Sequence, residues 1–324
     1  MRARWIRRPR RCPVTPETAV QALGVSKPWI RCVVGWLLAT AAMLAQAQDA
    51  PEPLTGTLLK ARETGSLTLG YRESSIPFSY VSARGEPIGY SIDLCKLVVD
   101  AIGAAVDREL TIRWQPVTPA SRIDAVVSGQ VDLECGSTTS NLERQKQVSF
   151  SPTMFVSGTK LMVKKGSPIR SFRDLAGKRV VVTAGTTNEK TMRELAVKFK
   201  IEMVLSVAAD HAASFAQLQA GQVDAFATDD VLLYGLLAQN KAQADYVVTG
   251  DFLSYDPYGI MFRKGDTQLA QLVDDTFHSL AEDREIERRY TRWFLRKLPS
   301  GVSLDLPMSP QLETIVQTMS ARTE

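Results

Sequence analysis

Polar and charged side chains follow several apolar runs in the middle of this sequence. Asp229 and Asp230 come directly after one run, and residues 137–139 (STT) follow another. Residues 183–187 (TAGTT) read as a strand-to-helix turn, where free backbone N–H groups and the helix dipole favour an anion. Groups of this kind at strand ends indicate a site for a small polar ligand.

Four further residues place charge near the same strand ends: Arg72, Arg122, Arg144 and His211. Each has an ordinary alternative explanation. An arginine near a helix end is often a solvated charge, a histidine beside Asp210 is often a polar cap, and an Asp pair often caps a helix. The shared position of these residues at strand ends, rather than any one of them, indicates a functional site.

Patterns of catalysis and metal binding are missing from the sequence. It contains no G-x-S-x-G elbow, no P-loop and no G-x-G-x-x-G fingerprint. The histidines and cysteines are too widely spaced to assemble a metal-ligand cluster. We therefore expect no catalytic residue, no metal and no cofactor.

The sequence repeats one helix–glycine–strand unit. Residues 123–136 (IDAVVSGQVDLECG) and 215–228 (FAQLQAGQVDAFAT) share the tetrapeptide GQVD at an offset of 92 residues. Gly129 and Gly221 are predicted to end helices in a left-handed conformation. The apolar run after each reads as a buried strand of a parallel sheet. This repeat predicts two similar α/β lobes.

Strands and helices alternate through the rest of the chain. Such alternation predicts sheets covered by helices on both faces, with ligands bound at the carboxyl ends of the strands. Ser171 is predicted to cap a helix start, and Trp293 and Phe294 to anchor the last helix to the core. Strands are predicted at residues 66–70, 112–116, 131–135, 180–183, 203–207 and 223–227, and helices at 92–106, 117–129, 185–200, 209–220, 231–239 and within 267–294.

The composition is that of a globular protein, with 44% hydrophobic and 23% charged residues in 324 positions, enough for about two domains. The net charge of +4 arises at the N-terminus, because residues 1–47 hold eight of the 39 Lys and Arg but one of the 35 Asp and Glu. The remaining 277 residues carry 31 basic and 34 acidic side chains. Their charge excludes a nucleic-acid-binding protein that relies on net positive charge.

Residues 1–47 have the pattern of a secretory signal peptide. An arginine-rich region over residues 1–31 precedes an uncharged apolar run at 32–45 and a small-x-small site that ends at Ala47. The alternative is a transmembrane anchor, but this run is shorter than the ~20 residues that cross a bilayer. We predict cleavage near Ala47 and an exported, soluble protein, and leave the initiation site open.

Two cysteines, Cys95 and Cys135, remain after such cleavage. They could pair in an oxidising compartment, but we favour two buried thiols that behave as small apolar side chains.

Several segments together resemble the glutamate/aspartate-binding proteins of bacterial ABC-type importers. The resemblance starts with residues 72–80 (RESSIPFSY), 89–93 (GYSID) and 134–147 (ECGSTTSNLERQKQ). It implies a two-lobed periplasmic binding protein of the Venus-flytrap type, in which parallel or mixed sheets are covered by helices and joined by a two-strand hinge. The match continues in order through residues 180–187, 210–211, 229–230 and 258–264, and covers nearly all of 54–300.

The resemblance also implies how the chain is divided. Lobe 1 is expected at residues 54–153 plus 259–300 and lobe 2 at 159–253, with hinge strands at 154–158 and 254–258. The tail at 301–324 has no firm match. The implied partners are L-glutamate or L-aspartate and an inner-membrane ABC-type permease, and we expect a periplasmic monomer that binds no nucleic acid.

The family roles carry over residue by residue. Arg144 matches the arginine that clamps the ligand α-carboxylate, since a guanidinium meets a carboxylate through two parallel hydrogen bonds. Asp229 matches the acid that receives the α-ammonium group. Arg72, Arg122 and His211 match the acidic-ligand subgroup, where they face the side-chain carboxylate. The implied ligand-binding residues are Arg72, Arg122, Ser137, Thr139, Arg144, Thr186, Thr187, His211 and Asp229.

One position departs from the subgroup. Where the subgroup has a serine that holds the distal carboxylate, this chain has Pro119, which has no donor. The preference between glutamate and aspartate therefore stays open. Two other functions also stay open: an enzyme on the same fold, such as a dehydratase, which ligand turnover would reveal, and a ligand-sensing ectodomain, which would need a membrane segment.

Overall fold

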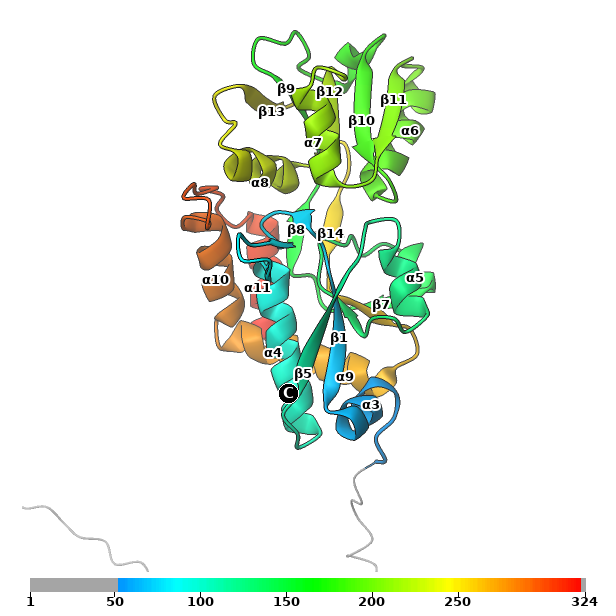
Figure 1. The fold of residues 1–324 in the computed structure, drawn as a ribbon, viewed down its shortest axis with the longest axis vertical. Helices are drawn as coiled ribbons and strands as arrows, with labels where there is room; N and C mark the ends of the chain where they lie inside the picture. The colour runs from blue at the N-terminus through cyan, green and yellow to red at the C-terminus, as the bar shows by residue number, and fades with distance from the viewer. Residues whose placement is uncertain (1–51, 322–324) are drawn as a thin grey trace, which may run out of the picture. The chain divides into compact units, whose positions relative to one another are not determined.

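The computed structural model describes residues 52–321. The predicted signal peptide at residues 1–47 therefore lies outside the described residues. Residues 54–321 form two α/β lobes, the lower and upper halves of Figure 1, each built on a five-stranded sheet.

Lobe 1 contains the sheet with strand order β5-β1-β6-β15-β7. Strand β1 pairs in parallel with β5 and β6, whereas β15 runs antiparallel to β6 and β7. A small hairpin sheet, β2-β3-β4, follows β1. The strands are β1 Ser66–Tyr71, β2 Ser74–Ser75, β3 Ser79–Val81, β4 Pro87–Ile88, β5 Thr111–Pro116, β6 Leu133–Glu134, β7 Val148–Phe150 and β15 Met261–Arg263.

Lobe 2 repeats this arrangement in the order β11-β10-β12-β9-β13. Strand β10 pairs in parallel with β11 and β12, and β9 runs antiparallel to β12 and β13. Both sheets are thus mixed, as the fold expectation allowed. The strands are β9 Thr159–Lys164, β10 Arg179–Thr183, β11 Val204–Ala208, β12 Ala225–Asp229 and β13 Tyr246–Thr249.

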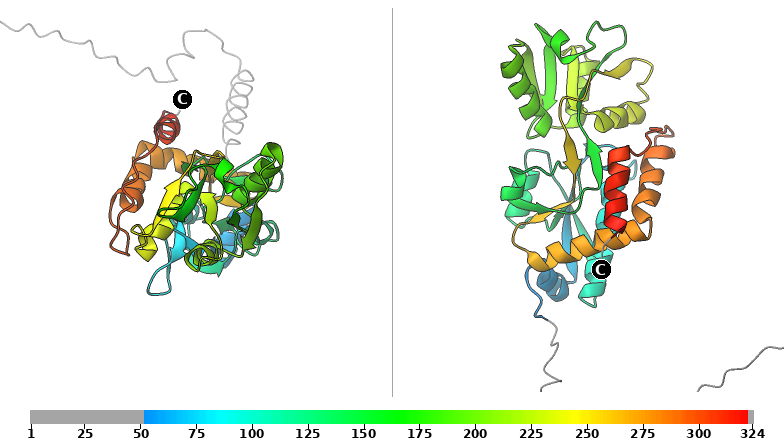
Figure 2. Two further views of the ribbon diagram at one scale, coloured as in Figure 1. Left: turned by 90° about the horizontal axis from the view of Figure 1, so that it is seen from above. Right: turned by 180° about the vertical axis from the view of Figure 1, so that it is seen from behind.

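Helices cover the sheets of both lobes. In lobe 2, α6 packs on β10 and β12, while α7 and α8 also contact β12. In lobe 1, α4 and α3 pack against α9, which crosses the base of the lobe in Figure 2. The α-helices are α3 Gly56–Thr64, α4 Tyr90–Ala105, α5 Arg122–Val127, α6 Thr187–Phe199, α7 His211–Gln219, α8 Asp230–Asn240, α9 Thr267–Glu282, α10 Glu285–Tyr290 and α11 Pro310–Ser320; shorter 3₁₀ turns lie at Arg144–Lys146 and Phe172–Leu175, and a π-helix at Thr291–Leu295.

The repeated GQVD segment performs the same task in each lobe. Gly129 and Gly221 follow α5 and α7 with positive φ angles of 76° and 67°, as predicted. The aspartate that ends the tetrapeptide then accepts a backbone N–H from the neighbouring strand: Asp132 from Thr68 and Asp224 from Arg179, each at 2.8 Å. These bonds fix the start of the central strand pair in each sheet.

Two antiparallel strands, β8 (Phe155–Ser157) and β14 (Asp256–Tyr258), run between the lobes. They lie against a buried aromatic cluster in which Phe155 is centred 4.9 Å from Phe78 and 5.0 Å from Phe294. Phe294 and Trp293 are buried, so the predicted anchoring of the last helical segment is confirmed.

The C-terminal segment forms a further helix, α11, for which the sequence resemblance provided no expectation. It packs on α9 and contacts β8, and Figure 2 shows it beside the strands that join the lobes. Ser309 caps it by accepting from Leu312 N, and Gln311 donates to the Tyr255 hydroxyl at 3.2 Å.

The favoured interpretation of the cysteines is wrong: Cys95 and Cys135 form a disulfide. The fold brings α4 beside the end of β6, so that the two Cα atoms lie 6.1 Å apart, within the range that a disulfide spans. Because the cysteines are 40 residues apart in the chain, their proximity depends on tertiary packing.

Several predicted boundaries also differ. Helix α5 starts only at Arg122, because Thr118 and Ser121 form a hydrogen-bonded turn ahead of it. Helix α6 starts at Thr187, where Thr186 caps it by accepting from the Glu189 N–H. No helix within residues 52–321 is long and apolar enough to cross a membrane.

Candidate ligand-binding site

A small pocket lies between the lobes. Both lobes contribute to its lining. The lining residues come from the ends of the equivalent strands β6 and β12 and from the first turns of helices α5, α6, α7 and α8. Seven of the nine predicted ligand-binding residues line it. The lining residues are Arg122, Ser137, Thr139, Thr186, Thr187, Asn188, His211, Asp229 and Leu232.

The lobes are closed around this pocket. Thr139 and Thr187 place their hydroxyl oxygens 3.2 Å apart, and Arg144 Nη2 donates to the Gly185 carbonyl at 3.3 Å. Gly185 has a φ of +71°, and a Cβ at this position would lie 2.6 Å from the Ala120 Cα. Only glycine therefore permits the observed approach of the turn before α6 to lobe 1.

Two of the predicted arginines are tied to the backbone after β6. Arg144 donates to the Thr139 carbonyl at 2.9 Å, and Arg122 donates to the Ser137 carbonyl at 3.2 Å. Both are buried, and Arg122 Nε is buried without a partner. Burial, and then the charge of Arg122, lowers the pKa of Arg144 to about 9. This site therefore concentrates positive charge away from water.

The third arginine, Arg72, follows β1 and is 1% exposed. Its side chain makes no hydrogen bond to any residue in the described range 52–321, and its Nη1 is buried without a partner. Burial, and then the charge of Arg122, lowers the pKa of Arg72 to about 9. A buried guanidinium with an unpartnered donor is costly, and the charges of Glu134 and Asp210 offset part of that cost.

Asp229 ends β12 at the N-cap position of α8, yet its side chain makes no cap bond. Its carboxylate instead accepts from Asn188 Nδ2 at 2.8 Å and from the Tyr258 hydroxyl. Burial, and then the charge of Asp256, raises the pKa of Asp229 to about 8. The ordinary helix-cap interpretation therefore fails here, and Asp229 is a buried acid suited to a cationic group.

His211 is the first residue of α7, not part of a loop, and a chain of hydrogen bonds fixes its tautomer. Ser214 donates to the Asp210 carbonyl at 2.9 Å, so Thr183 Oγ1 must donate to Ser214 Oγ, 2.8 Å away. His211 Nδ1, 3.0 Å from Thr183 Oγ1, then has to donate to it. Burial and two nearby arginines lower the pKa of His211 well below its usual value. The ring is neutral, and its Nε2 carries a lone pair.

Residues 67–296 match the family of bacterial extracellular solute-binding proteins, family 3. The chain belongs to this family.

Two relatives of this solute-binding protein have names that state glutamate and aspartate. It is 45% identical over 285 residues to the "L-glutamate/L-aspartate-binding protein" of Pseudomonas aeruginosa, covering 86% of this chain and 94% of that protein. It is 39% identical over 280 residues to the "Glutamate/aspartate import solute-binding protein" of Escherichia coli K12, covering 86% and 93%.

Solved structures share the two-lobed fold. An ancestral arginine-binding protein bound to arginine matches with a TM-score of 0.65 at 30% identity, covering 71% of this chain and 98% of that one. An ancestral amino acid-binding protein, described as a precursor of cyclohexadienyl dehydratase, matches with a TM-score of 0.64 at 28% identity, covering 74% and 99%. The predicted fold class and family of this solute-binding protein are therefore confirmed.

Sequence reasoning missed two residues that line the pocket, Asn188 and Leu232. Asn188 is buried and links Asp229 to Thr159, donating to the Thr159 hydroxyl at 2.7 Å. Its signal was its place directly after Thr187 in the same strand-to-helix turn. Leu232 lies in the apolar sequence of α8, where nothing distinguishes it from a core residue.

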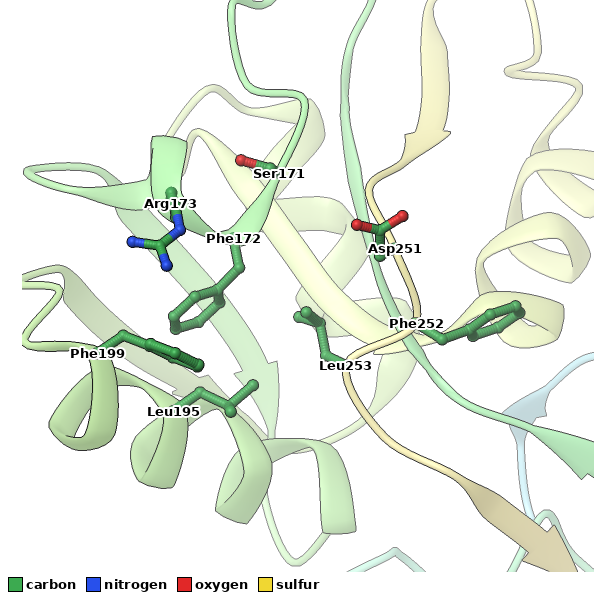
Figure 3. Close-up of a pocket in the computed structure, with 8 residues that line it drawn as sticks. All are labelled: Ser171, Phe172, Arg173, Leu195, Phe199, Asp251, Phe252 and Leu253. Atoms are coloured by element: carbon green, nitrogen blue, oxygen red, sulfur yellow. The ribbon is translucent and has the colours of Figure 1, made fainter.

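A larger pocket of this solute-binding protein lies on lobe 2 alone. Figure 3 shows Phe172, Phe199 and Leu195 close together on one wall, with Asp251 and Leu253 on the segment opposite. It contains none of the predicted ligand-binding residues. Within residues 52–321, no group of histidine, cysteine, aspartate and glutamate side chains could hold a metal ion.

Proposed function

We propose that this solute-binding protein captures glutamate or aspartate between its lobes and delivers it to an ABC-type permease. The observation that carries the proposal is a buried group of three arginines, of which Arg122 lines the pocket and acts through its charge on the other two. An amino acid with a neutral side chain needs only one arginine. The names of the relatives that are 45% and 39% identical support it. The cationic residues are Arg72, Arg122 and Arg144.

The α-amino and α-carboxylate groups of the ligand bind near β6, α6 and β12 in this proposal. Arg144 holds the α-carboxylate, together with Ser137, Thr139 and the N-terminal turn of α6. Ser137 Oγ is buried and has no partner within the described structure, so it has a free proton to donate. Asp229 receives the ammonium group, held in place by Asn188 and Tyr258.

The side-chain carboxylate of the ligand meets Arg72, Arg122 and His211. Arg72 Nη1 and Arg122 Nε are buried donors without partners, and leaving such donors unpaired costs more than a hydrogen bond returns. A carboxylate satisfies them, whereas the amide of glutamine offers one acceptor and two donors. Pro119 supplies no donor at this end, so the arginines carry more of the recognition.

Binding and release follow from movement of the lobes about residues 154–158 and 254–258, which we propose as the hinge. We place the mature protein in the periplasm as a monomer, after removal of an export signal that ends near Ala47. Capture and delivery require no chemical change of the ligand, so the proposed function includes no catalytic step.

Calorimetry with the mature chain tests the ligand assignment. Glutamate or aspartate should bind with a Kd of about 1 μM or tighter. Glutamine should bind much more weakly, because its amide leaves the buried arginines without a counter-charge. Arginine and lysine serve as cationic control ligands and should not bind. Equal affinity for glutamate and glutamine would overturn the proposal.

A further inference from the structure

A further buried acidic residue lies beside the proposed ligand-binding arginines and belongs to none of the roles assigned above. Glu134, the last residue of β6, is 0% exposed. Its Oε2 accepts a hydrogen bond from Thr138 Oγ1 at 2.5 Å, while its Oε1 is buried without a partner. An ionised carboxylate in this position is stable only if cations lie nearby.

The nearby cations are the proposed ligand-binding arginines. Arg122 Nη1 donates to Thr138 Oγ1 at 2.6 Å, so one hydroxyl separates Arg122 from Glu134. At Gly136, an added Cβ would lie 2.2 Å from Glu134 Oε1 and 2.8 Å from Arg72 Cγ. The side chains of Glu134 and Arg72 thus meet at the Gly136 backbone, where only a glycine leaves room for both.

Glu134 is close to these arginines without forming an ion pair with them. Among residues 52–321, no arginine or lysine nitrogen lies within 4.0 Å of its carboxylate. Its charge nevertheless acts on all three guanidinium groups and opposes the effect of burial on their pKa values. Glu134 therefore stabilises the charged arginines through space.

The negative charge of Glu134 attracts the arginines but repels the side-chain carboxylate of a bound ligand. A side-chain carboxylate that meets Arg72 and Arg122 also approaches Glu134, and charges a few ångströms apart interact strongly in a buried site. The attraction of the arginines and the repulsion of Glu134 together decide how strongly the site prefers an acidic ligand.

We propose that Glu134 sets the charge selectivity of the site. Its negative charge offsets part of the positive charge of the three arginines. An acidic ligand therefore binds more weakly, and a ligand with a neutral amide more tightly, than they would without Glu134. This inference rests on the proposed function, because it concerns the ratio of glutamate to glutamine affinity.

The variant Glu134→Gln tests the inference, because its amide oxygen still accepts from Thr138 while the charge is gone. The Kd for glutamate should fall and that for glutamine should stay or rise, so that the glutamine-to-glutamate Kd ratio increases about tenfold or more. Calorimetry with both ligands measures the ratio. An unchanged or smaller ratio would overturn the inference.

The variant Thr138→Val is the matched control, since it removes the hydroxyl between Arg122 and Glu134 but retains the carboxylate charge. Its Kd ratio should equal that of the wild type. If Thr138→Val alone raises the ratio, Glu134 acts by positioning Arg122 and the charge inference is wrong. A raised ratio in Thr138→Val would overturn the inference even if Glu134→Gln fails to fold. Should the wild type itself show no preference for glutamate, the proposed function fails instead.

Discussion

Thr139 of lobe 1 and Thr187 of lobe 2 face each other with hydroxyl oxygens 3.2 Å apart, and Thr139 also donates to Asp256 in the strand β14 at 3.1 Å. One side chain therefore contacts the opposite lobe and the strand that joins the lobes. Because Thr139 also lines the pocket, closure of the lobes and completion of the binding site occur at the same residue.

Closure should depend on Gly185. In Gly185→Ala, the new Cβ would meet backbone atoms of Ala120 and Pro119 in the opposite lobe, so the closed state should be destabilised and every ligand should bind about tenfold more weakly or worse. Gly221→Ala is the matched control, because it has a similar positive φ but open space around its Cβ. Both variants should carry a similar strain of about 1–2 kcal/mol.

Small-angle scattering separates these two glycine variants. Saturating glutamate should compact the wild type and Gly221→Ala, whereas Gly185→Ala should compact less at the same occupancy. If the wild-type profile does not change at saturation, the pocket is rigid and the proposed hinge is wrong.

The two ends of the ligand should respond to different arginines. Arg144→Ala should weaken all amino-acid ligands alike, whereas Arg122→Ala should weaken glutamate selectively. Removing one partner of a buried charge pair costs about 2–5 kcal/mol, or roughly 30-fold to several thousandfold in affinity. Calorimetry with glutamate and glutamine measures both. If Arg122→Ala leaves the ratio of glutamate to glutamine affinity unchanged, Arg122 does not contact the side-chain carboxylate and is an ordinary helix-start residue.

Binding of the ligand ammonium group should release a proton from Asp229. The pKa of Asp229 is raised to about 8 by burial, so the empty site at pH 7 holds a protonated acid, whereas an ammonium group favours the carboxylate. Affinity should therefore rise with pH between about 6 and 8. Calorimetry at pH 7 in buffers of different ionisation enthalpy should detect close to one proton released per glutamine bound. An affinity that is flat over this pH range would contradict the role.

Glutamate should release fewer protons than glutamine, because of His211. Its Nε2 carries a lone pair, which repels a carboxylate until it is protonated, and the carboxylate itself raises the pKa of the ring. Asp229 releases the same number of protons with both ligands, so the difference in proton release between glutamine and glutamate measures the protonation of His211. In Ser214→Ala, Thr183 is free to donate its hydroxyl proton to His211 Nδ1. The neutral ring can then carry its proton on Nε2 and donate it to the ligand carboxylate. The difference in proton release between glutamate and glutamine should therefore vanish.

The disulfide should support both stability and binding. It closes a loop of 40 residues, and its loss in Cys95→Ala/Cys135→Ala should lower the unfolding free energy by about 2–5 kcal/mol. Cys135 precedes Gly136 and the hydroxyl-bearing segment of the site, so ligand affinity should fall as well. Denaturation with and without reductant measures the effect, and reductant should not alter the double variant.

Local features of the sequence were enough to predict much of the fold. The alternation of strands and helices, the left-handed Gly129 and Gly221, and the cap at Ser171 depend on residues within a few positions of each other, which act through backbone conformation and short-range hydrogen bonds. The position of polar residues at the ends of β6 and β12 follows equally from local pattern, since parallel strands expose their carboxyl ends at one edge.

Other features were decided only when distant segments packed together. The pairing of Cys95 with Cys135, the tautomer of His211 and the burial of Glu134 beside Arg72 each require neighbours from separate elements of the chain. The residues themselves carry no local mark of these roles: Glu134 is one acid among 35. Side-chain identity and periodicity therefore indicated the chemistry of this protein, and tertiary packing determined its charge balance, because burial and the distance between charges exist only in the folded chain.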